Sequence, residues 1–101
     1  MKIKRLKKLR VNSKVFTIKW DYNEAGGHFD YRTLTLELNG KFPEDILFEV
    51  LCHELMEIVA VDMNVRLDRP DVLEDYIFVY DHRQFTTMMS MYAGLITQFL
   101  G

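Results

Sequence analysis

The chain has 101 residues, of which 49% are hydrophobic, and its formal net charge at pH 7 is −2. This length predicts a single domain, residues 1–101, whose core is large enough to fold without covalent staples. A lone cysteine, Cys52, excludes an internal disulfide, and no apolar run is long enough to cross a membrane. No apolar secretion-signal core follows the basic start, so we expect a soluble cytoplasmic protein.

The charge is unevenly placed along the chain. Residues 1–20 hold eight Lys/Arg and no acid, whereas residues 21–101 hold five Lys/Arg against all fifteen acids. The basic start, MKIKRLKKLR, fits either a contact with nucleic acid or an acidic partner, or a solvated strand edge whose lysines prevent association between sheets. No aromatic or glycine residues accompany these charges, and the remainder of the chain is acidic. Composition therefore favours the strand edge and argues against nucleic acid as a partner.

Alternating apolar and polar residues predict the first half of the chain to be a sheet. Residues 15–20 and 32–38 alternate cleanly, and residues 6–11 do so loosely, with Asn12-Ser13 as a turn. The segment between the second and third stretches, YNEAGGHFD, is expected to be a loop because it contains Gly26-Gly27. We therefore predict a short antiparallel sheet of about three strands with one covered face.

Helical patterns dominate the second half. A helix is predicted over residues 43–63, with a proline in its first turn and acids near its positive end. Residues 64–72 are predicted to be a connector, and residues 73–80 fit either a helical turn or an extended segment. Asp81 and Gln84 have the spacing of a capping box before an amphipathic helix over residues 82–100. The fold class is therefore α+β.

The stretch VLCHELMEIV, residues 50–59, places three ionisable groups in an apolar helix. His53 and Glu57 lie one turn apart, and Glu54 adjoins them, so all three fall within an arc of roughly 100°. Such groups must be paired, protonated or bound to a cation when they are buried. Zinc accepts imidazole nitrogen and carboxylate oxygen, commonly from three protein ligands. A carboxylate beside the first histidine can take a proton from water.

A third ligand has to come from another element. His82 projects toward the apolar face of the last helix, so it is expected to dock against the central helix. His28, in the glycine-containing segment, is expected to be a loop residue or a group on the substrate side. In the alternative interpretation no metal is involved: His53 and Glu57 form a buried polar pair held by an arginine, and His82 is bonded to backbone. The candidate arginines are Arg66, Arg69 and Arg83.

The motif LCHELMEIVAV, followed by the histidine of YDHRQF, resembles small zincin-type metallopeptidases, which are mostly encoded by bacteriophages and related mobile elements. The resemblance covers about residues 9–100. It implies a minimal zincin-like fold, in which a short antiparallel sheet packs on an active-site helix and a C-terminal helix. It also implies that His53, Glu57 and His82 bind zinc and that Glu54 is the general base. Glu57 replaces the second histidine of H-E-x-x-H, and Thr86 stands where relatives carry an aspartate.

The function implied by this resemblance is that of a zinc-dependent peptidase or other hydrolase, acting on a peptide or protein in the cytoplasm of a bacterial host. Manganese or iron would suit the same ligands. The edge of residues 32–38 is a candidate for aligning a peptide by strand addition, and Tyr76, Tyr80 or His28 for stabilising an oxyanion. The alternative is a non-catalytic metal-binding or interaction module on the same core. Nucleic-acid binding through residues 2–10 ranks third.

Overall fold

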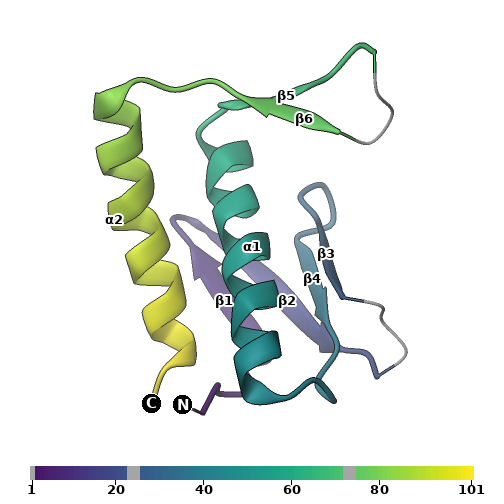
Figure 1. The fold of residues 1–101 in the computed structure, drawn as a ribbon. Coiled ribbons are helices and arrows are strands. Elements are labelled where there is room, and N and C mark those ends of the chain that lie inside the picture. Colours follow the sequence, from purple (N-terminus) through teal and green to yellow (C-terminus); the bar gives the residue numbers. More distant parts are fainter. Residues whose placement is uncertain (1, 23–25, 72–74) are drawn as a thin grey trace.

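The computed structural model describes residues 2–22, 26–71 and 75–101. These residues form an α+β domain, which confirms the predicted fold class (Figure 1). The elements in chain order are β1 (Lys8–Val11), β2 (Lys14–Trp20), β3 (Gly27–Asp30), β4 (Thr35–Leu38), α1 (Glu44–Asp62), β5 (Arg66–Asp68), β6 (Tyr76–Phe78) and α2 (His82–Phe99). Within this described part of the chain, neither helix combines the length and apolar character needed to span a membrane.

The main sheet differs from the predicted antiparallel one. It has four strands in the order β1-β2-β4-β3, with β2 and β4 parallel and the two outer pairs antiparallel. The extra strand, β3, comes from the segment that was expected to be a loop. It has only four residues, too few for a visible alternation, and it is held by pairing with β4, where Phe29 lies opposite Leu36.

The edge strands of the sheet consequently differ from the edge predicted at residues 32–38. Because β4 is bonded to β2 on one side and to β3 on the other, its backbone offers no free edge to a peptide. The expectation that residues 32–38 align a peptide by strand addition is therefore wrong. Among the described strands of this sheet, β1 and β3 are the edge strands.

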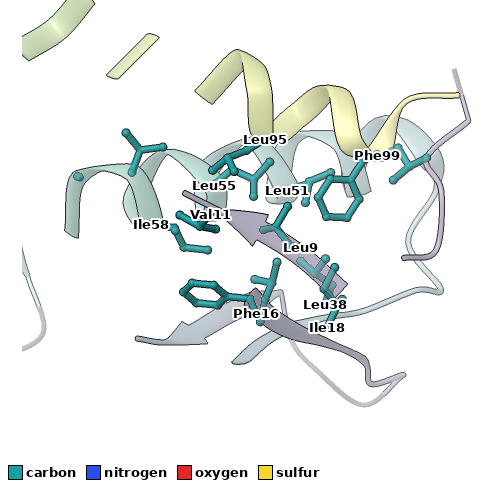
Figure 2. Packing of buried hydrophobic residues seen from close by; sticks show 14 of the residues in the cluster. Leu9, Val11, Phe16, Ile18, Leu38, Leu51, Leu55, Ile58, Leu95 and Phe99 are labelled. Carbon is teal, nitrogen blue, oxygen red and sulfur yellow. The ribbon is translucent and has the colours of Figure 1, made fainter. Parts of the chain in front are cut away.

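The core lies between one face of this sheet and the two helices. Figure 2 shows side chains of β1, β2 and β4 directed toward those of α1 and α2. The labelled core residues are Leu9, Val11, Phe16, Ile18, Leu38, Leu51, Leu55, Ile58, Leu95 and Phe99, each at most 5% exposed. The burial of this apolar area is the main source of stability for a two-layer domain.

The helices match their predicted bounds to within one residue. Both halves of the capping box at α2 are present: the Gln84 backbone N–H donates to Asp81 Oδ1 at 2.8 Å, and the Asp81 N–H donates to Gln84 Oε1 at 2.9 Å. The two helices run in opposite directions (Figure 1), so α2 begins near the end of the molecule where α1 finishes.

A second, two-stranded sheet lies near the end of α1 (Figure 1). Its strand β5 falls within residues 64–72, which were predicted to be only a connector, and its strand β6 lies in the ambiguous segment 73–80. The Val79 N–H donates to the Val65 carbonyl at 2.9 Å and continues this pairing toward α1. Three-residue strands carry too little periodicity to be recognised from sequence. Residues 72–74 lie outside the described part of the chain.

Candidate metal centre

The middle of α1 brings together His53, Glu54 and Glu57, as the helical spacing predicts. One ligand atom from each lies within 4.8 Å of the other two. His53 Nε2 is 2.6 Å from Glu57 Oε2 and 3.7 Å from Glu54 Oε2. The imidazole is 67% exposed, whereas the carboxylates are 9% and 18% exposed. The group therefore has a solvent-accessible nitrogen beside two largely buried oxygen donors.

His82 is not a member of this group. It is the first residue of α2, and its side chain is exposed. His53 precedes the last residue of α1 by nine positions, which is roughly 13 Å along the helix axis, while α2 starts near that end of α1. The buried face of α2 begins only at Met88, so the expectation that His82 docks against α1 is wrong. Its role as third ligand stays a prediction.

His28 also lies in a different setting from the one expected. It belongs to β3 rather than to a loop, and its Nε2 is 2.7 Å from Glu37 Oε2 on the neighbouring strand. His28 and Glu37 are directly opposite each other in the register of β3 and β4. The imidazole is therefore part of a cross-strand pair.

Glu57 is held from its other side by Arg66. Arg66 Nη1 lies 2.9 Å from Glu57 Oε1, and both side chains are at most 20% exposed. The guanidinium carbon is 3.8 Å from the centroid of the Tyr76 ring and 5.4 Å from that of Phe29, distances typical of cation–π contacts. The arginine-held pair considered from sequence is thus present with Arg66 as the partner. The two aromatic contacts were not predicted, because they depend on how β5 and β6 pair.

Glu54 is the most deeply buried ionisable group of the cluster. Burial raises the pKa of its carboxyl group to about 7, and the negative charge of Glu57 adds to this rise, while the charges of His53, His28 and Arg66 oppose it. Within the described part of the chain, no group donates a hydrogen bond to this carboxyl. A carboxyl group with a pKa near neutrality can both accept and return a proton at physiological pH.

The burial of Glu54 depends on a close approach between β3 and α1. A Cβ atom added at Gly27 would lie 3.1 Å from Glu54 Cγ and 3.0 Å from Val50 Cγ1. Any larger side chain at this position would push β3 away from the helix. Gly27 thus allows the edge strand to cover Glu54. The sequence had indicated only a loop at this glycine.

A mostly apolar cavity of about 460 Å³ opens beside the group, between α1, the end of β6 with the residues that follow it, and α2. Its lining residues are Cys52, His53, Met56, Glu57, Phe78, Tyr80 and Met88. The Tyr80 ring stacks on Phe85 with 6.2 Å between centroids, and both rings remain more than 40% exposed. The pair of His53 and Glu57 therefore borders a pocket whose lining suits an apolar side chain or ligand.

The donor set fits a divalent transition metal. One imidazole nitrogen and two carboxylate oxygens suit zinc, manganese or iron. No protein-family model, curated protein or solved structure matches the chain. A metal at this position is supported by the chemistry and spacing of the three side chains.

Proposed function

We propose that the chain is a metal-dependent hydrolase of peptide bonds on a minimal zincin-like core. His53 and Glu57 are the proposed ligands, and Glu54 is the proposed general base. The observation that carries the proposal is a buried carboxyl group with a pKa of about 7, directly beside the facing pair of His53 and Glu57. The charge of Glu54, which is only 9% exposed and lies beside that of Glu57, is costly without a cation that compensates it.

The ligands would be held by their own neighbours. Glu57 Oε2 faces His53 Nε2 at 2.6 Å while Oε1 is fixed by Arg66, so a metal ion would take the place of the direct contact between the two ligand atoms. A zinc ion would lower the pKa of a coordinated water to about 7 and would polarise the carbonyl of the substrate. His82 remains the predicted third protein ligand, and it would have to approach α1 from its exposed position. Glu54 lies nearer to the pair, but as the proposed base it is not counted among the ligands.

Glu54 would act as the proton carrier. Its carboxylate takes a proton from the attacking water and gives it to the departing amine. A pKa near 7 suits both directions, since the ionised and protonated forms are then similarly populated at neutral pH. The absence of hydrogen-bond donors to this carboxyl among the described residues leaves it available for both transfers.

The surroundings suit an extended peptide. β3 is an edge strand that packs against α1 at Glu54, and strand addition there would bring a backbone carbonyl close to the group. The apolar cavity bordered by His53 and Glu57 is next to the same group. These two features support a peptide as the substrate class.

The proposal is tested by metal analysis and one isosteric variant. Protein purified without chelators should contain zinc or another divalent metal, and added zinc should raise its melting temperature by linkage. Glu54→Gln should retain the metal and lose turnover of a peptide library, whereas His53→Ala should lose both. Protein that contains no metal and does not respond to added zinc would exclude the proposal.

One observation favours a non-catalytic interaction module instead. The ion pair with Arg66 already compensates Glu57 without a metal, and Tyr76 stabilises the guanidinium. A module of this kind should bind its partner equally well when Glu54 is replaced by Gln. Equal partner binding by wild type and variant, together with no turnover by either, would favour the module.

A further inference from the structure

The basic start of the chain lines a groove far from the candidate metal centre in sequence. The groove has a volume of about 510 Å³ and is lined by Lys4, Leu6, Lys8, Arg10, Val15, Thr97 and Gln98. We call it the basic groove. Four of these residues alternate along the N-terminal segment, which places their side chains on one side of an extended backbone. Among the described residues, no aspartate or glutamate lines it.

The three cations of the basic groove form no ion pair with a carboxylate in the described part of the chain, a property that they share with several other lysines and arginines. The side chains that do form ion pairs with carboxylates are Arg5, Lys14, Arg32, Arg66 and Arg69. In the described part of the chain, no carboxylate oxygen lies within 4.0 Å of the side-chain nitrogens of Lys4, Lys8 or Arg10. Lys8 Nζ donates only to Thr17 Oγ1, at 3.1 Å. Three exposed like charges along one side of an extended segment, with no counterion among the described residues, are suited to an anionic ligand.

We propose that the basic groove binds the phosphodiester backbone of a single-stranded nucleic acid. Composition ranked this partner last because the rest of the chain is acidic, but no aspartate or glutamate of the described residues is among those that line the groove. Residues 4–10 span roughly 20 Å in an extended conformation, so a flexible strand can follow them. No aromatic side chain of the described residues lines the groove, so its contacts are with phosphates and are independent of sequence.

An acidic peptide fits this groove less well, because the edge of β1 is already occupied. Gln98 Oε1 accepts from the Arg10 N–H at 3.0 Å, and Gln98 Nε2 donates to the Arg10 carbonyl at 2.8 Å. The Lys4 N–H likewise donates to the Phe99 carbonyl at 2.8 Å. A peptide therefore cannot add as a further strand at these positions and would retain only side-chain contacts. A phosphate backbone needs no such edge.

The test compares two triple variants with equal charge change. The groove variant replaces Lys4, Lys8 and Arg10 with glutamine. The control variant makes the same replacement at Lys2, Lys41 and Arg83, which are exposed and lie outside the groove. Binding of a fluorescent ten-nucleotide single strand is followed by fluorescence anisotropy at salt concentrations from about 20 to about 200 mM, a range over which the Debye length shortens as salt is added. With three phosphate contacts, the slope of log K against log salt should be about −2.

The groove variant should bind at least roughly tenfold more weakly with a slope near zero, whereas the control variant should stay within about twofold of wild type. The charge-preserving variant Lys4→Arg/Lys8→Arg/Arg10→Lys should retain binding, which separates charge from folding. Lack of binding by wild type at low salt, or equal loss in both triple variants, would overturn the proposal. Tighter binding of a duplex or of poly-glutamate than of the single strand would overturn it as well.

Discussion

Replacing Glu54 with glutamine should make the metal-free protein more stable at neutral pH. Glutamine has the shape of a protonated glutamate but carries no charge to desolvate. The folded-state pKa of Glu54 is about 7 against a reference value of 4.5, a difference that corresponds to at most ~3.4 kcal/mol at ~1.36 kcal/mol per pH unit. The carboxylate keeps a residual 9% exposure to solvent, which screens its charge, so we expect about 1–3 kcal/mol.

The sign follows from proton binding. Between pH 4.5 and about 7 the folded state holds the Glu54 proton more tightly than the unfolded state does, so the wild-type free energy of unfolding falls as pH rises through this window. The glutamine variant lacks this decrease. The charge of Glu54 should therefore cause little difference between the two free energies of unfolding near pH 4. The difference should grow up to about pH 7, with the variant more stable.

Urea denaturation at several pH values from 4 to about 8, with a chelator present, measures this divergence. The quantity of interest is the variant's free energy of unfolding minus that of wild type, because the titration of groups that do not interact with Glu54 cancels in this difference. A difference that does not change with pH, or that favours the wild type at neutral pH, would refute the assignment of a raised pKa to Glu54.

Three further predictions concern stability. Arg66→Met should lower the free energy of unfolding by about 1–3 kcal/mol in urea titrations, because the partly buried charge of Glu57 then keeps only its contact with His53; an unchanged value would mean that the ion pair contributes nothing. Gly27→Ala should cost about 1–3 kcal/mol, since its Cβ would lie near 3.0 Å from α1, whereas Gly26→Ala, with nothing within 4 Å, should be tolerated; equal effects would contradict the close packing. Asp81→Ala should remove the capping box of α2 at a cost of about 1 kcal/mol, visible as a lower melting temperature, and no change in it would show that the cap is dispensable.

The two helices were predictable because their signals are local. A capping box, a proline before the first turn and a sustained apolar period fixed their ends to within one residue. The sheet was less predictable, since β3 is only four residues long and includes Gly27. The parallel pairing of β2 with β4 depends on contacts between distant residues, which a pattern of alternation does not encode.

The same distinction applies to the candidate metal centre. The grouping of His53, Glu54 and Glu57 follows from helical geometry alone, and the structure places them together. The position of His82 depends on how far α2 extends past α1, and sequence periodicity gives the face of a helix but not its axial offset. The choice of Arg66 over two other arginines likewise depends on the pairing of β5 with β6, which only the folded chain reveals.

The Arg66 contact joins the candidate ligand to the wall of the cavity. Arg66 is paired in register with Phe78, and Phe78 lines the cavity beside His53. Glu57→Ala would therefore remove a candidate ligand and also the carboxylate that holds Arg66 of β5, so any effect of this variant could come from either change. Glu57, Arg66 and Phe78 therefore form one connected set, and a substitution at any of them is expected to disturb the candidate site and the cavity wall together.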